Sequence, residues 1–202
     1  MLDFVLKGRA QGIFIGLGLG GKEVGFPPEL FSDVFAEARR QDLHVVAHAG
    51  ETEGPPSVWG AIRSLQAERI GHGVRAIEDD QLVKHLSQTQ IPLEVSPYSN
   101  YHLNIVSPDQ PHPIRTLMDR GVYVTVNTDD PPMFSTDLTS EYVLLAGQGF
   151  SWDELWQLNL NALEASFLSD EVKAIYRAEW QTFASQQIEA EIALNNRCFE
   201  LE

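Results

Sequence analysis

Three short polar segments carry side chains that titrate or bind metals, and each follows a short apolar run. They are His48-Ala49-Gly50-Glu51, Gly71-His72-Gly73 and Asn127-Thr128-Asp129-Asp130-Pro131. A carboxylate three residues after a histidine is placed to act as a base or proton shuttle beside a metal-bound water. Two adjacent carboxylates repel each other and are seldom found together without a cation or a donor. We therefore expect these side chains where strands end, which is the edge at which α/β proteins do their chemistry.

Each of these residues also has a structural interpretation. A lone histidine such as His48 is most often structural, and it is Glu51 that favours a metal ligand. His72, between two glycines, fits a structural role as well as a functional one. The pair Asp129-Asp130 could instead cap the helix that follows. The other histidines lack such neighbours and are expected to be surface or packing residues: His44, His85, His102 and His112.

A glycine-rich turn, Gly18-Leu19-Gly20-Gly21, precedes these segments. It lacks both the G-x-G-x-x-G spacing and the Gly-Lys-Ser/Thr ending of phosphate-binding loops. Two interpretations remain, a close approach of the backbone to a flat ligand and a plain turn between strand and helix. The segment Tyr98-Ser99-Asn100 leaves a similar choice between lining a pocket and shaping a turn.

Strand-like runs and helical patterns alternate five times along the chain. The predicted strands cover residues 12–17, 43–47, 69–70, 91–95 and 122–126, and apolar residues at helical spacing follow each of the first four. Such units in series predict a parallel sheet of the α/β class. Beyond the fifth strand the pattern is purely helical, with a capping box at Ser151 and Glu154 and a longer helix starting at Ser169. Residues 1–202 show no linker and are expected to form a single domain.

Composition excludes several classes of function. The net charge of −15 and only 14 scattered Lys and Arg residues argue against nucleic acid as a partner. Cys198 is the only cysteine, which excludes an intrachain disulfide and cysteine-rich zinc sites and fits a reducing, cytoplasmic setting. No apolar run approaches the ~18 residues that a membrane span requires. We therefore expect a soluble protein with no membrane partner.

Taken together and in order, the motifs resemble the adenosine deaminase family of the amidohydrolase superfamily. The resemblance rests on the segments 48–51, 69–73, 96–100 and 125–131, at their present separations. The segment Gly16 to Glu23 is similar to the strand and substrate loop that precede them in the family. The likeness covers nearly the whole chain, and it is the ordered set that makes it specific.

The resemblance implies a zinc-dependent (β/α)8 TIM-type barrel that replaces the 6-amino group of a purine with oxygen. His48 and Asp129 would be ligands of one Zn²⁺ per site. Glu51 would protonate the purine ring, and His72 would orient or deprotonate the metal-bound water. Zinc chemistry of this kind agrees with the residue types, because zinc brings the pKa of bound water toward neutrality.

The resemblance also implies contacts with the substrate. The backbone of Gly21 would contact the six-membered ring, and Asp130 would hold a nitrogen of the five-membered ring. Adenosine, adenine and a larger adenine-bearing nucleoside such as aminodeoxyfutalosine remain open as substrates. A nucleoside monophosphate is not favoured, since no basic cluster lies near the motifs.

The chain departs from the family pattern in two main ways. No His-x-His pair, which completes the family's zinc site on its first strand, occurs in the sequence. The five predicted strands correspond to the last five of eight, so the chain resembles the C-terminal part of a deaminase and an incomplete barrel. Gly18 and Ser96 also stand where relatives often carry Asp and Cys.

Three hypotheses follow. The first is an active deaminase whose missing strands come from another chain or an upstream segment. The second is a truncated, non-catalytic remnant that folds or acts only with a partner chain. The third, a metal-dependent phosphoesterase on the same barrel, is disfavoured by the acidic balance and by the absence of a second-metal lysine or histidine cluster. The unpaired edges of a five-stranded sheet favour self-association or pairing with a missing N-terminal segment.

Overall fold

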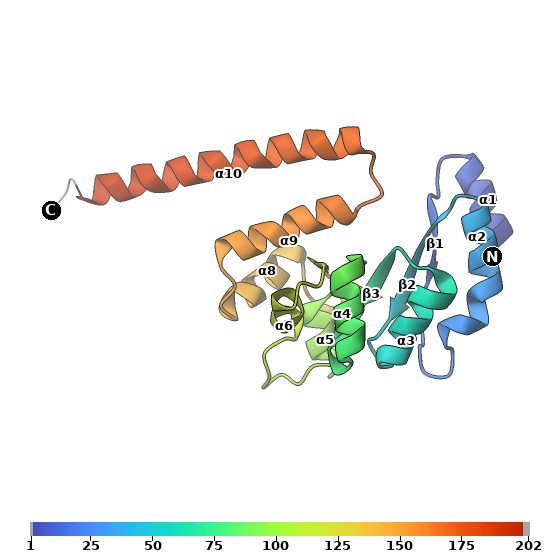
Figure 1. Cartoon of the computed structure of the whole chain (residues 1–202). Helices are drawn as coiled ribbons and strands as arrows, with labels where there is room; N and C mark the ends of the chain where they lie inside the picture. The colour runs from blue at the N-terminus through green and yellow to red at the C-terminus, as the bar shows by residue number, and fades with distance from the viewer. Residues whose placement is uncertain (1, 200–202) are drawn as a thin grey trace. The chain divides into compact units, whose positions relative to one another are not determined.

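A five-stranded parallel sheet organises the computed structural model, which describes the backbone of residues 2–199 and the side chains of residues 2–186 (Figure 1). The strands lie in chain order, β1-β2-β3-β4-β5, and every neighbouring pair is parallel. Their bounds are β1 Gly16–Leu19, β2 His44–Ala49, β3 Arg69–His72, β4 Leu93–Val95 and β5 Val124–Val126. This arrangement confirms the α/β class and the parallel sheet.

Helical segments connect the strands, as parallel pairing demands. Between β1 and β3 these are the 3₁₀ segment η1 Pro28–Phe31, α2 Ser32–Arg40, α3 Pro55–Gly60 and the π-helical η2 Ala61–Leu65, while α1 Leu2–Ala10 precedes β1. Between β3 and β5 they are the 3₁₀ segment η3 Val74–Glu78, α4 Asp80–Thr89, α5 Pro97–His102 and α6 Ile114–Asp119. Beyond β5 the chain is helical, as predicted, with α7 Pro131–Phe134, α8 Leu138–Gly147, α9 Trp152–Ala165 and α10 Asp170–Phe199.

Helix starts follow the capping chemistry of the sequence. The predicted capping box is present before α9, where the Glu154 N–H donates to Ser151 Oγ and the Ser151 N–H donates to Glu154 Oε2. Asp79 caps α4 by accepting from the N–H groups of Gln81 and Leu82. Such caps satisfy donors that have no partner inside the helix.

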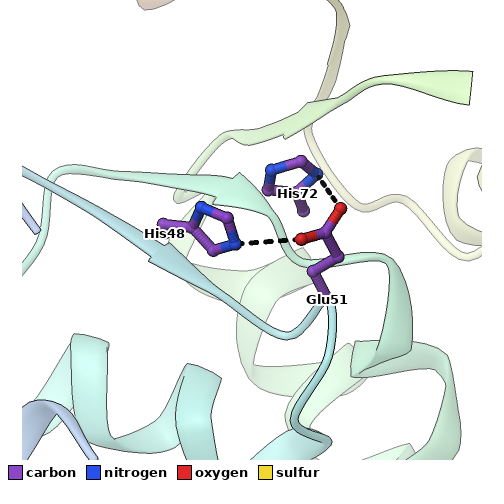
Figure 2. Close-up of side chains that lie close together, drawn as sticks. All are labelled: His48, Glu51 and His72. Carbon is purple, nitrogen blue, oxygen red and sulfur yellow. Dashed lines mark hydrogen bonds and ion pairs between the residues drawn. The ribbon is translucent and has the colours of Figure 1, made fainter. Parts of the chain in front are cut away.

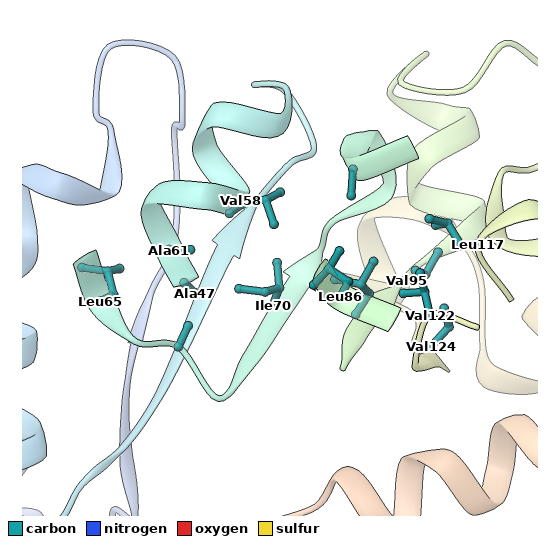
Figure 3. Close-up of a cluster of buried hydrophobic side chains, with 14 of the residues drawn as sticks. Ala47, Val58, Ala61, Leu65, Ile70, Leu86, Val95, Leu117, Val122 and Val124 are labelled. Atoms are coloured by element: carbon teal, nitrogen blue, oxygen red, sulfur yellow. The ribbon is translucent and has the colours of Figure 1, made fainter. Parts of the chain in front are cut away.

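The apolar core lies against the sheet and holds the strands in register (Figure 3). Ala47 lies opposite Ile70 across β2 and β3, and Leu93 lies opposite Val124 across β4 and β5. Apart from Ala47, which is 1% exposed, these side chains are fully buried. Because truncating a buried Leu or Ile to Ala costs roughly 2–5 kcal/mol, this core fixes the strand ends on which the polar motifs sit.

The strand bounds differ from the sequence prediction, most of all at β1, which runs to Leu19 and so includes Gly18 and Leu19 of the expected turn. The strand expected at residues 12–17 begins only at Gly16, because the preceding residues end α1: the N–H groups of Gly12 and Ile13 donate to the carbonyls of Arg9 and Gly8, and Gly12 has a φ of 71°. The segment after β4 forms the short helix α5, which begins at Pro97. Proline suits the first turn of a helix, where its missing N–H is not needed.

The chain divides into two compact units, Met1–Asn161 and Ala162–Glu202. The first contains the sheet and the polar motifs. Within the second, Arg177 pairs with Glu164. The single domain expected from the sequence stays a prediction. Among the described residues, no helix is long and apolar enough to cross a membrane.

Candidate active site

The carboxyl ends of β2 and β3 bring three of the predicted site residues together (Figure 2). His48 lies in β2 opposite Gly71, and His72 ends β3 opposite Ala49. Glu51 follows β2 and points back between the two imidazoles. Glu51 Oε2 lies 3.1 Å from His48 Nε2, and Glu51 Oε1 lies 3.3 Å from His72 Nδ1. The spacing read from the sequence therefore produces a compact cluster.

Glycines allow the loops that carry this cluster to meet. Gly50 has a φ of 75°, and a Cβ placed on it would lie 2.4 Å from the Val58 side chain and 3.2 Å from the Cα of Gly73. No side chain fits there. The loops are joined by the Gly73 N–H, which donates to Ala49 O, and by the Arg75 N–H, which donates to Gly50 O.

His72 adopts a backbone conformation that is uncommon for a residue with a side chain. Its φ is 63°, in the left-handed region, and Gly73 follows at 66°. Burial lowers the pKa of the His72 imidazole, although the nearby Glu51 opposes this shift. The neutral ring is therefore favoured at neutral pH. Left-handed residues of this kind concentrate at functional sites, where the surrounding structure holds them.

Glu23, which the sequence analysis gave no role, lies beside the cluster. Its side chain is 4% exposed, and its Oε1 lies 3.2 Å from His48 Nε2. Burial would raise the pKa of Glu23, but hydrogen bonds from His48 and from the Glu51 backbone hold the pKa at about 2. In return, hydrogen bonds to Glu23 and then Glu51 raise the pKa of His48 to about 9.

Asp129 lies on the far side of His72. Its Oδ2 is 3.9 Å from His72 Nε2 and accepts a hydrogen bond from Ser99 Oγ. Asp129 has a φ of 56°. Asp130 stands at the N-cap position of α7 but makes no capping hydrogen bond with its side chain. Since α7 opens with Pro131 and Pro132, its first two residues have no N–H to cap.

Gly21 borders a pocket that reaches the cluster. The pocket has a volume of about 270 Å³, and Gly21, Glu23, Phe31 and His48 are among its lining residues. Gly21 has a φ of 99°, and nothing lies within 4 Å of the position a Cβ would take. The glycine turn thus leaves open space beside His48, as a close approach of the backbone to a flat ligand requires.

The cluster has donors suited to a metal ion. One ligand atom each from His48, Glu51 and His72 lie within 4.8 Å of one another. Glu51 Oε1 and His72 Nδ1 are buried and face each other at 3.3 Å, but within the described part of the chain neither forms a hydrogen bond. Imidazole nitrogen and carboxylate oxygen are ligands that zinc accepts. Of the two predicted zinc ligands, His48 belongs to this group, whereas Asp129 lies outside it, with its Oδ2 3.9 Å from His72 Nε2. The assignment of both as ligands stays a prediction.

Sequence reasoning missed two residues that support the site, Glu23 and Ser99. Glu23 stands in the segment that resembles the family's substrate loop, but a single glutamate after a glycine turn has no local signal of burial. For Ser99 the sequence is compatible with lining a pocket and with shaping a turn. In the structure Ser99 is fully buried and donates a hydrogen bond to Asp129. Of the histidines without context, His112 is a packing residue, being 1% exposed and bonded to Asn100.

Comparison with known proteins agrees with this geometry. The adenosine deaminase family model matches residues 2–180. An adenosine deaminase of Shewanella loihica is 45% identical over 82% of this chain and 50% of its own length. An aminodeoxyfutalosine deaminase of Streptomyces avermitilis is 44% identical over 88% of this chain and 49% of its own length. The chain thus spans about half the length of the curated relatives it matches.

Solved structures show the same likeness. A crystal structure of adenine deaminase from Arthrobacter aurescens superposes with a TM-score of 0.86 at 33% identity, over 91% of this chain and 57% of that chain. An amidohydrolase from Burkholderia ambifaria, crystallised with bound zinc, superposes with a TM-score of 0.85 at 28% identity. The match covers 94% of this chain and 53% of that chain. The sheet is therefore a partial barrel of the TIM type. This chain belongs to the adenosine deaminase family.

Proposed function

We propose that this chain supplies the C-terminal part of a zinc-dependent aminohydrolase that converts a 6-aminopurine to the 6-oxo form. The observation that carries the proposal is the meeting of His48, Glu51 and His72 beside the pocket at Gly21, in a member of this family. In the reaction water adds its oxygen at C6 of the purine, and the amino nitrogen leaves as ammonia.

His48 and Asp129 are the residues proposed to hold zinc. When bound, zinc supplies Lewis-acid activation of water at neutral pH. His72 suits the role of base, because burial keeps its imidazole neutral and able to accept a proton. Glu51 lies between the two histidines and would donate a proton to the purine ring, neutralising the charge that arrives there.

The proposed substrate is adenosine or a related adenine-bearing nucleoside or base. The relatives named above are deaminases of adenosine, aminodeoxyfutalosine and adenine, which share a 6-aminopurine. We assign Gly21 to the six-membered ring, because its backbone borders the pocket without a side chain. We assign Asp130 to a nitrogen of the five-membered ring, because its side chain is not used to cap α7.

A second candidate is a non-catalytic member of the family that acts only with a partner chain. It is carried by the donor set of the described residues, because His48 and Asp129 are two proposed ligands, whereas a catalytic zinc site usually takes three protein ligands. We propose a cytoplasmic location for either, on the strength of the single cysteine.

The test is to fuse residues 1–202 to the N-terminal half of the Shewanella loihica relative and to measure bound zinc by elemental analysis. Loss of adenosine, adenine and aminodeoxyfutalosine is followed by chromatography. We expect near-stoichiometric zinc and turnover of at least one substrate. His48→Ala should abolish both, whereas His44→Ala, at the other end of β2 beside Glu68, should leave both in place. Zinc without turnover of any of the three would favour the second candidate.

A further inference from the structure

One carboxylate accepts hydrogen bonds from four consecutive backbone N–H groups. Glu23 Oε2 accepts from Gly50 N at 2.9 Å and from Glu53 N at 3.2 Å. Glu23 Oε1 accepts from Glu51 N at 3.0 Å and from Thr52 N at 3.3 Å. Successive N–H groups that converge in this way form a concave site for an anion, and here the chain fills that site with its own side chain.

These four donors depend on Glu23. Gly50 opens the loop with a φ of 75°, and Pro55 and Pro56, which follow the loop, have no N–H groups. Gly50 and Glu51 are buried, and a buried N–H without an acceptor costs roughly 1–3 kcal/mol, so without Glu23 these two N–H groups would have to reach water. The loop therefore owes its shape to a residue 27 positions earlier in the sequence.

Glu23 also joins two parts of the site. It stands two residues after Gly21, whose backbone borders the pocket, and both residues line that pocket with His48. At its other end it holds the backbone of Glu51. Glu23 therefore links the backbone beside the pocket to the backbone of Glu51. A charge-assisted bond to each carboxylate oxygen is about twice as strong as a neutral one, which makes this link stiff.

We propose that Glu23 is a positioning residue, which fixes the Gly50–Glu53 loop and thereby sets the placement of Glu51 against His48 and His72. The inference rests on the proposed function only for the chemical role of Glu51; the placement itself is independent of zinc and of turnover.

The experiment uses residues 1–202 labelled with ¹⁵N, in wild-type form and as Glu23→Gln. Glutamine keeps the size of the side chain but puts an NH₂ donor where two N–H groups need an acceptor. We expect the amide exchange of Gly50, Glu51, Thr52 and Glu53 to accelerate at least tenfold, while Ile70 and Leu93 in the sheet change less than twofold. The imidazole ¹⁵N shifts of His48 and His72 should also move.

Two further variants separate the acceptor role from packing. Glu53→Gln removes a carboxylate from the same loop without touching the four bonds, and it should match wild type in every readout. Glu23→Ala should show the same accelerated amide exchange as Glu23→Gln. Added formate, a carboxylate small enough for the adjoining pocket, should restore slow exchange in Glu23→Ala, whereas neutral formamide should not.

Unchanged exchange of the loop in Glu23→Gln would overturn the proposal. So would acceleration spread evenly over the sheet, because that marks a residue that merely stabilises the fold, and so would imidazole shifts identical to wild type. None of these readouts involves zinc content or deamination. Zinc content and deamination test the proposed function, whereas amide exchange and imidazole shifts test the role of Glu23. A failure of one proposal is therefore distinguishable from a failure of the other.

Discussion

Ser99 in α5 donates a hydrogen bond of 2.6 Å from its Oγ to Oδ2 of Asp129, which follows β5. Ser99 is fully buried, whereas the Asp129 side chain is 26% exposed. The start of α5 is itself held by Glu141, whose Oε2 accepts from the N–H of Tyr98. A residue proposed to bind zinc is thus oriented by a helix that follows a different strand.

Ser99→Ala should weaken zinc binding by about tenfold or more in the fused protein. Removing a residue that hydrogen-bonds to a metal ligand and orients it typically lowers metal affinity by roughly 10–100-fold. Zinc competition with a chromogenic chelator measures the effect. Ser107→Ala is the control, since it deletes an exposed hydroxyl that bonds to Asp109 in the same manner. Equal affinity in wild type and Ser99→Ala would show that Asp129 is oriented by something else.

Glu51→Gln should lower turnover by at least the ~10²-fold typical of an acid–base group, while substrate still binds. The amide keeps the shape of the side chain but has no proton of suitable acidity to give to the ring. Steady-state kinetics of the fused protein give kcat and KM separately. Glu53→Gln, two residues further along the loop, serves as the control. Wild-type kcat in Glu51→Gln would remove Glu51 from the reaction.

Asp129→Ala and Asp130→Ala should have different effects. Asp129 faces His72, so its loss should lower zinc content. Asp130 is proposed to face the substrate, so its loss should leave zinc in place and raise KM. Elemental analysis gives the zinc content of each variant, and steady-state kinetics on the same preparations give its KM. Loss of zinc in both variants, or in neither, contradicts this division of roles.

His112 should make stability fall as the pH is lowered. Burial lowers the pKa of its imidazole from 6.5 to about 3 in the folded chain. Between those values the unfolded chain binds more protons, so the free energy of unfolding decreases as pH falls, by on the order of 3 kcal/mol from pH 7 to pH 4. Urea unfolding at the two pH values measures the loss.

The variant His112→Gln isolates this contribution. It should be less stable at pH 7, because the contact with Asn100 is altered, but it should lose less stability on acidification than wild type. His102→Gln, at an exposed position, should lose as much as wild type. The same loss in wild type and His112→Gln would show that carboxylates alone account for the acid sensitivity.

The sequence allowed the cluster to be predicted because its members sit on local signals. His48 and Glu51 follow an apolar strand within four residues, and glycines flank His72, so strand ends and turns could be read directly. Glu23 could not be assigned in this way, since its partners are backbone N–H groups of a loop distant in sequence. Every residue except proline has a backbone N–H, so a side chain that bonds to backbone N–H groups leaves no pattern of residue types in the sequence.

The sheet was likewise predictable in class but not in detail. Alternating strand and helix patterns indicate parallel pairing wherever they occur. Ile13 reads as a strand residue, yet it is exposed and its N–H donates to Gly8 O in the turn that ends α1, whereas the Ile15 carbonyl already accepts from the His44 N–H of β2. The competing helix-terminal turn, set by Gly12, outweighs the local preference of β-branched side chains.

The strict chain order of the sheet implies an order in time. Each strand pairs only with the strand made just before or after it, so the sheet can grow as the chain leaves the ribosome. His48, Glu51 and His72 all come from β2, β3 and the loop after β2, so we expect the cluster to be able to form before β4 is added. Asp129 follows β5, so it joins the site only after β4 and β5 have been added to the sheet. If His48 and Asp129 both bind the metal as proposed, that binding is therefore expected only after β5 has been synthesised.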